Sequence, residues 1–221
     1  MTRDATPEAA EAVALKLRVL SVPVLLRLLG SETSEGTGGL LRFREEPANL
    51  LDHLLFAEQD REAMIFLAHA LPGREAVWWG CMCVAATRPV DAPDAEREAV
   101  EAARAWVWQP QAAGRAERAI ATSRACADLP GGWPGLAIAW SRSLGSAEAG
   151  YGRGIEGAVQ RAARRGDSRH QVATAELEAA RMRRFVMSGA AISRGEAGLI
   201  EEEAGAPATA APVLRPTRSV S

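Results

Sequence analysis

Thiol and imidazole side chains are the residues of this sequence best suited to nucleophilic or metal chemistry. The chain has three cysteines, an odd number that gives no paired disulfide framework, and three histidines. Cys81 and Cys83 stand two residues apart in a predicted helix, so their side chains diverge by about 200° and cannot share one metal ion. HExxH and GxSxG motifs are absent, which leaves Cys81 or Cys83 with His69 as a hypothetical thiol enzyme. We expect buried, reduced cysteines, no metal site and no catalytic residue.

A literal GxGxxG pattern spans residues 152–157 (GRGIEG). A dinucleotide site requires a β-strand directly before this pattern. The preceding residues 145–151 are predicted to form a polar, glycine-rich loop after a helix, so we expect no dinucleotide, and no other cofactor is indicated. The alternative at this position is a phosphate or other anion held by a helix N-terminus together with Arg153.

The segment LPGREAVWWGC, residues 71–81, carries the strongest candidate binding residues. Trp and Arg are enriched at binding hot spots, which makes Arg74, Glu75, Trp78 and Trp79 candidates for contact with a partner. Adjacent tryptophans on a helix point about 100° apart, so one ring can fill the core while the other reaches a neighbouring helix or the surface. The alternative is that both rings are buried and that Arg74 and Glu75 fix the helix start.

The charges are distributed unevenly along the chain. Residues 151–194 hold nine arginines and four acids, a net charge of +5, whereas residues 91–101 hold five acids and one arginine, a net charge of −4. Solvated helix faces are the ordinary explanation, and steering of a charged partner is the other. The pI of about 6.0 argues against nucleic-acid binding, because nucleic-acid-binding domains are usually basic as a whole.

The composition predicts helices as the supporting elements. Alanine occupies 45 of the 221 positions, against one tyrosine and four phenylalanines, which favours helices over strands. Apolar residues recur at helical spacing, and proline or glycine separates the segments. The segment after Pro72 is apolar almost all round, so we expect it to be the central helix. The predicted helices cover residues 8–20, 23–29, 47–56, 60–71, 72–86, 94–108, 111–127, 134–144, 155–162 and 169–187, with a weaker one over 190–204; residues 31–39 and 145–154 are predicted loops.

These elements predict an all-α fold. We expect a compact multi-helix bundle or a short solenoid-like stack of antiparallel helix pairs, because short connections favour antiparallel neighbours. The predicted organisation has N-terminal helices and a flexible loop over residues 1–39 and a helical domain over 40–204. Residues 205–221 contain three prolines and no packing period, which predicts a disordered C-terminal tail.

The sequence predicts neither a secretory signal nor a membrane span. The N-terminal residues carry Asp4 and Glu8 and lack an apolar core, and the leucine-rich stretch over 13–29 is interrupted by charges and a proline. The longest apolar run, residues 76–86, is too short to cross a bilayer. We therefore expect a cytoplasmic protein that does not bind membranes.

Three segments resemble those of a family of uncharacterised bacterial proteins. They are LPGREAVWWGC (71–81), the preceding AMIFLAHA (63–70), and RRFVMSGAAISRG (183–195). The resemblance to the family's LPxREAVWWxC segment, its preceding helix and its RRF-containing helix covers residues 47–195. It implies genes near those of type VI secretion, beside spike-tip and adaptor proteins, and therefore an accessory or adaptor role. It brings no catalytic residue with it.

These observations favour a non-enzymatic helical interaction module, an adaptor or accessory of a larger bacterial assembly, with a protein partner. The alternative is a small-molecule or anion-binding helical domain whose pocket is formed by Arg74, Trp78, Trp79 and the arginines near Arg153. The third hypothesis is the thiol enzyme described above.

Overall fold

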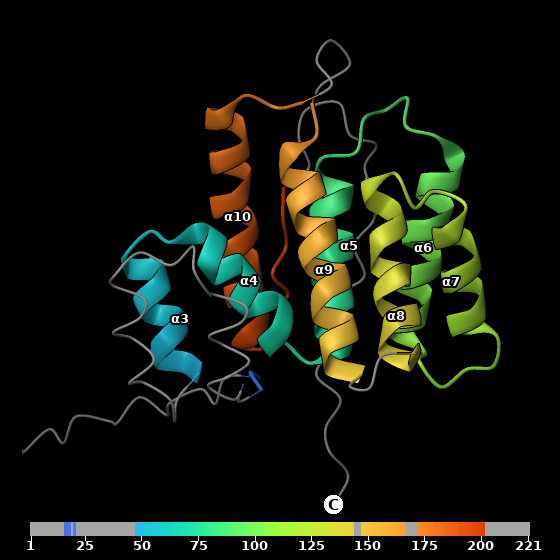
Figure 1. The fold of residues 1–221 in the computed structure, drawn as a ribbon, viewed down its shortest axis with the longest axis horizontal. Helices are drawn as coiled ribbons and strands as arrows, with labels where there is room; N and C mark the ends of the chain where they lie inside the picture. The colour runs from blue at the N-terminus through green and yellow to red at the C-terminus, as the bar shows by residue number, and fades with distance from the viewer. Residues whose placement is uncertain (1–15, 19, 21–46, 144–146, 167–171, 202–221) are drawn as a thin grey trace, which may run out of the picture.

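The structure is a computed structural model that describes residues 16–18, 20, 47–143, 147–166 and 172–201. Every regular element in these ranges is helical, which confirms the predicted all-α class (Figure 1). An isolated β-bridge joins Arg165 to Val172. The helices are α3 (Pro47–Phe56), α4 (Asp60–Ala70), α5 (Gly73–Ala86), α6 (Asp94–Trp108), α7 (Arg115–Arg124), the short 3₁₀ helix η1 (Pro130–Gly132), α8 (Trp133–Ser143), α9 (Ala147–Arg164) and α10 (Ala175–Ser193).

Two helices, α5 and α9, run side by side through the middle of the bundle (Figure 1). Every residue of α5 from Ala76 to Ala86 is buried, which confirms its predicted central position. The predicted loop over 145–154 is wrong, because α9 begins at Ala147 and continues through the whole GxGxxG pattern. The glycines that suggest a loop in the sequence are instead places where neighbouring helices approach the α9 backbone.

One face of α9 is made of glycine and packs on α8. A Cβ atom at Gly150 would collide with the backbone of Trp140, one at Gly154 would lie 2.5 Å from the Ala137 Cα, and one at Gly157 would collide with the Trp133 ring. These three glycines follow the spacing i, i+4, i+7, which places them on one side of a helix. The two antiparallel helices therefore touch almost backbone to backbone.

Two further faces of α9 pack on α5 and α4. Towards α5, the Tyr151 ring covers Gly73 and the Ile155 side chain covers Gly80, so these two helices run parallel. Towards α4, Gly152 lies under the ring of His69. Because α9 contacts α4 and α5, which are distant from it in the sequence, the molecule is a compact bundle; repeats in a solenoid contact only their neighbours.

The helix ends are fixed by glycine and by one side-chain cap. The helix predicted over 111–127 begins at Arg115, after Gly114 at φ 76°. The helix predicted over 169–187 begins at Ala175, where the Thr174 hydroxyl accepts a hydrogen bond from the Leu177 amide (3.3 Å). It continues to Ser193, so the separate helix predicted over 190–204 is wrong. Gly195 and Gly198 follow it at positive φ, a conformation that ends helices.

The N-terminal residues that the structure describes differ from the prediction of a helix over 8–20. Residues 16–18 are not helical, and two of their amides donate hydrogen bonds to helices of the bundle. The Lys16 amide donates to the Ser193 carbonyl (2.6 Å), and the Arg18 amide donates to the Ala70 carbonyl (2.7 Å). Both carbonyls end helices, where no intrahelical donor is available to them. The predicted helix over 23–29, the loop over 31–39 and the tail over 205–221 lie outside the described residues.

A buried ion pair joins the start of α6 to the end of α9. The side chain of Glu96 is fully buried, and its Oε1 accepts hydrogen bonds from Arg165 Nη2 (2.5 Å) and from the Gly131 amide of η1 (2.9 Å). The first turn of α6 is a favourable place for a carboxylate because of the helix dipole. Glu96 thus ties three segments together at one end of the bundle.

We predict that Gly154→Ala destabilises the protein, although the same change in an open helix stabilises by roughly 0.5–1 kcal/mol. The added methyl group would collide with the α8 backbone, and such overpacking costs about 1–3 kcal/mol. Chemical denaturation measures the effect. The matched control on the exposed side of α9 is Arg153→Ala, which should change stability by less than about 0.5 kcal/mol. A neutral or stabilising Gly154→Ala would contradict the backbone contact.

We further predict that Glu96→Ala lowers the free energy of unfolding by about 3–5 kcal/mol, because it leaves the largely buried Arg165 guanidinium without its carboxylate. Thermal or urea unfolding measures the loss. Glu98→Ala, at an exposed position of the same helix, is the control and should leave stability almost unchanged. Similar effects of the two substitutions would show that the buried ion pair does not stabilise the bundle.

Candidate functional site

The two adjacent tryptophans of α5 lie in the core. Trp78 and Trp79 are 1% and 0% exposed. The Trp79 indole donates a hydrogen bond to the Phe185 carbonyl of α10 (2.9 Å). The Trp78 ring packs edge-on against Trp108 with 6.0 Å between ring centroids, and the Arg104 guanidinium lies 5.3 Å from its centre. Of the two readings that the sequence leaves open, the structure supports the buried one, so neither ring is presented to a partner.

The other candidate binding residues occupy two separate places. Arg74 and Glu75 are half-buried in the first turn of α5, and Arg153 is exposed on α9. The Tyr151 ring covers Gly73, next to Arg74. Arg153 follows Tyr151 by two residues, about 200° around the helix, so it points away from α5. The structure therefore does not bring Arg153 to the Arg74 side of the bundle.

The GxGxxG pattern has no free helix N-terminus to offer a phosphate. Gly152 is the sixth residue of α9, which begins at Ala147, so its amide belongs to the helix interior. The predicted anion site at Arg153 therefore loses its physical basis. The glycines of this pattern instead serve packing on α8 and α4.

The three thiols are buried and protonated at neutral pH. Burial raises the pKa of Cys81 to about 12, despite the favourable charge of Arg104, and raises the pKa of Cys83 well above its usual value. Burial, together with the nearby carboxylate of Glu96, raises the pKa of Cys126 to about 11. Nucleophilic cysteines need the opposite shift, because the thiolate is the reactive form. These are the features of packing cysteines.

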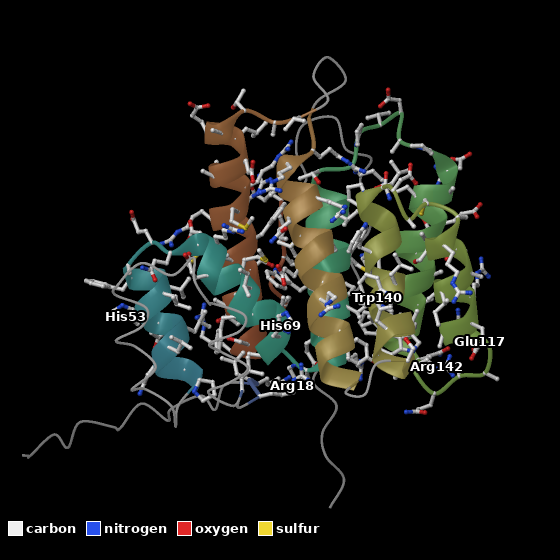
Figure 2. All side chains as sticks on the ribbon, viewed as in Figure 1. Arg18, His53, His69, Glu117, Trp140 and Arg142 are labelled. Carbon is white, nitrogen blue, oxygen red and sulfur yellow. The ribbon has the colours of Figure 1, made fainter. Side chains whose placement is uncertain are left out.

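His69 faces a carboxylate. Its Nε2 lies 3.4 Å from Glu156 Oε2, and its ring rests on Gly152, so the imidazole is held between α4 and α9 (Figure 2). The His69 carbonyl accepts a hydrogen bond from the Arg18 guanidinium (2.7 Å), which fastens the N-terminal segment to the end of α4. His69, the histidine of the Cys–His hypothesis, is therefore paired with Glu156 of a neighbouring helix.

A groove of about 570 Å³ opens where the start of α4 meets the end of α9 and the start of α10. Small-molecule sites have volumes of about 300–1,000 Å³. The groove is not predicted from the sequence, and the signal that could have found it is the charged run EQDRE, residues 58–62, at the junction of two predicted helices. The lining consists of Glu58, Gln59, Asp60, Arg61, Glu62, Gln160, Arg164, Ala175, Glu178, Ala179 and Met182.

Two ion pairs already neutralise part of the charge in this lining. Arg164 Nε lies 2.8 Å from Glu178 Oε1, and Arg183 Nη1 lies 2.7 Å from Asp60 Oδ1. Arg183 also donates to the Leu55 carbonyl (3.3 Å), so α10 holds the joint between α3 and α4. Elsewhere, Arg142 of α8 and Glu117 of α7 form an exposed pair of 2.9 Å, which Figure 2 shows on the far side of the bundle.

In the ranges that the structure describes, no group of three or more His, Cys, Asp or Glu side chains is placed to hold a metal ion. None of the helices within the same ranges is both long and apolar enough to cross a membrane.

We predict that Cys81 and Cys83 resist alkylation in the folded protein. With a pKa of about 12, Cys81 is a thiolate in only about one molecule in 10⁴ at pH 8, and its sulfur is buried. Iodoacetamide labelling followed by mass spectrometry measures the rate. The same protein in guanidinium chloride is the control and should be labelled rapidly. Rapid labelling of either cysteine in the native protein would revive the thiol-enzyme hypothesis.

Comparison with known proteins places the chain in a family. A family model described as "Family of unknown function (DUF6931)" matches residues 50–193, more than half of the chain. The match ends at the residue where α10 ends, and it includes both central helices and the groove lining. No curated protein and no solved structure matches the chain. The chain therefore belongs to this family of unknown function.

Proposed function

We propose that this protein is a non-enzymatic helical interaction module that serves as an adaptor or accessory of a larger bacterial assembly. The observation that carries the proposal is Phe56, whose side chain is 88% exposed at the end of α3, two residues before Glu58 in the sequence. Burying a phenylalanine contributes about 1.5–3 kcal/mol, and this ring contributes almost none of that to the fold. Aromatic side chains of this kind are typical anchors of protein interfaces.

A second exposed apolar side chain belongs to α10. Met187 of α10 is 43% exposed, one helical turn after Arg183, and Arg183 bonds to the Leu55 carbonyl beside Phe56. Helices α3 and α10 thus each carry an exposed apolar side chain close in the sequence to the contact between Leu55 and Arg183, a combination that suits a protein partner. Arg74 and Glu75, half-buried at the start of α5, stay predicted contacts of a partner.

The cellular setting is part of the same proposal. The resemblance of residues 71–81 to an LPxREAVWWxC segment suggests an assembly associated with type VI secretion. A cytoplasmic location agrees with three free cysteines, since disulfides are rare in that compartment. The dipolar charge distribution supports a charged protein partner rather than nucleic acid.

A small-molecule-binding domain is the second candidate function, and the groove favours it. The anion-binding form of this alternative is less well supported, because the groove lining holds four carboxylates and two arginines. Neither Arg74 nor Arg153 lines the groove, so this groove is not the pocket expected from the sequence.

We predict that Phe56→Asp lowers recovery of the partner at least tenfold when the tagged protein is cross-linked in cells of its native organism and purified. Val90→Asp, at another exposed apolar position (72%), is the matched control and should leave recovery unchanged. The double variant Arg74→Ala/Glu75→Ala tests the start of α5 in the same experiment. Mass spectrometry identifies the partner.

Three outcomes would count against this proposal. Absence of a stoichiometric partner with the wild-type protein would remove the adaptor role. Equal recovery by all variants would show that the partner binds elsewhere. A partner unrelated to any secretion assembly would remove the type VI association while leaving the interaction module.

A further inference from the structure

We infer that the groove at the start of α4 binds a basic and partly apolar peptide segment of the partner protein. This inference rests on the proposed function and adds the chemistry of the contact. The groove is formed by three parts of the chain: the α3–α4 joint with the first turn of α4, the end of α9, and the first turns of α10. Its volume of about 570 Å³ suits a few side chains rather than a whole helix.

The lining of the groove contains both apolar and polar side chains. Ala175, Ala179 and Met182 of α10 provide an apolar strip. The amide side chains of Gln59 and Gln160 also belong to the lining, and Gln160 already donates a hydrogen bond to Glu156 (3.2 Å). Arginine and lysine have aliphatic stems that pack on such a strip while their charged ends remain in a polar rim. The groove therefore matches the shape of a long basic side chain.

The charges of the lining point to the same occupant. Asp60 and Glu178 are paired with arginines, and they also lie at the N-termini of α4 and α10, where the helix dipoles favour carboxylates. Glu58 lies outside both helices, and Glu62 follows in the first turn of α4. Neither of these two carboxylates forms an ion pair with another residue in the described ranges.

Within the part of the chain that the structure describes, the carboxylates at positions 58 and 62 have no ion-pair partner, although the Arg183 guanidinium, which bonds to Asp60, also feels the charge of Glu58. A guanidinium binds carboxylates through paired, charge-assisted hydrogen bonds, which are stronger than neutral ones. An anionic ligand would instead meet four carboxylates in a lining with two arginines. The exposed Phe56 precedes Glu58 by two residues in the sequence, so an apolar residue of the same peptide has an aromatic side chain close along the chain to contact.

The test is a selection from a phage-displayed library of random peptides on the purified full-length protein. The variant Glu58→Gln/Glu62→Gln keeps the size of both side chains and removes their charge. Glu98→Gln/Glu101→Gln makes the same charge change at two exposed positions of α6 and is the matched control. Thermal unfolding of all three proteins verifies that they are folded.

We predict that wild type and control enrich the same peptides, rich in arginine or lysine and apolar residues. Synthetic versions should bind Glu58→Gln/Glu62→Gln at least fivefold more weakly by fluorescence anisotropy, and added salt should weaken their binding to wild type. Absence of enrichment, enrichment of acidic peptides, or equal binding to the double variant would overturn the inference. Equally tight binding of free argininamide would also overturn it, since the groove would then be a small-molecule site.

The cellular experiment separates this inference from the proposed function. A partner recovered equally by wild type and by Glu58→Gln/Glu62→Gln would overturn the role of the groove and leave the adaptor role. Selected basic peptides without any partner in cells would remove the adaptor role and leave the binding chemistry of the groove.

Discussion

The close approach of α9 to its neighbours is the constraint on which the bundle depends. A glycine in a helix interior costs roughly 1 kcal/mol relative to alanine, and α9 carries four glycines. The face formed by Gly150, Gly154 and Gly157 offsets this cost because it lets the α8 backbone and the Trp133 ring come to van der Waals distance. A methyl group at any of these positions would push the two helices apart, and the contacts that α9 makes with α4 and α5 would change with them.

This central helix also positions the polar features of the molecule. Gly152 and Glu156 occupy the α4 face of α9, where His69 packs, and Gln160 follows one turn later in the groove. At the end of the helix, Arg165 is held by the buried Glu96, and its neighbour Arg164 reaches Glu178 of α10. Helix α9 thus positions one side of the groove relative to the sides formed by α4 and α10. Such positioning is a requirement for any site that binds a defined ligand.

The residues with the most obvious chemistry serve packing in this structure. The thiols of Cys81 and Cys83 and the rings of Trp78 and Trp79 fill the interior of a helix that is apolar almost all round. The surface is where binding chemistry remains, in the carboxylates of the α3–α4 joint and in an exposed phenylalanine ring. The proposed roles, an interaction module with a peptide-binding groove, therefore rest on these surface residues and not on the buried thiols and tryptophans.

The sequence by itself determined the helical class, the central place of α5 and the bounds of helices such as 47–56 and 94–108, because local periodicity and proline or glycine punctuation act over a few residues. Only the tertiary structure decided that residues 147–154 are helical, since glycine has low intrinsic helix propensity and the compensating contacts come from α8 and α4. The groove has the same origin: Glu58, Arg164 and Met182 are distant along the chain, and only packing brings them together. The burial of both adjacent tryptophans was likewise decided by the neighbouring helices. The periodicity of one helix carries no information about those neighbours.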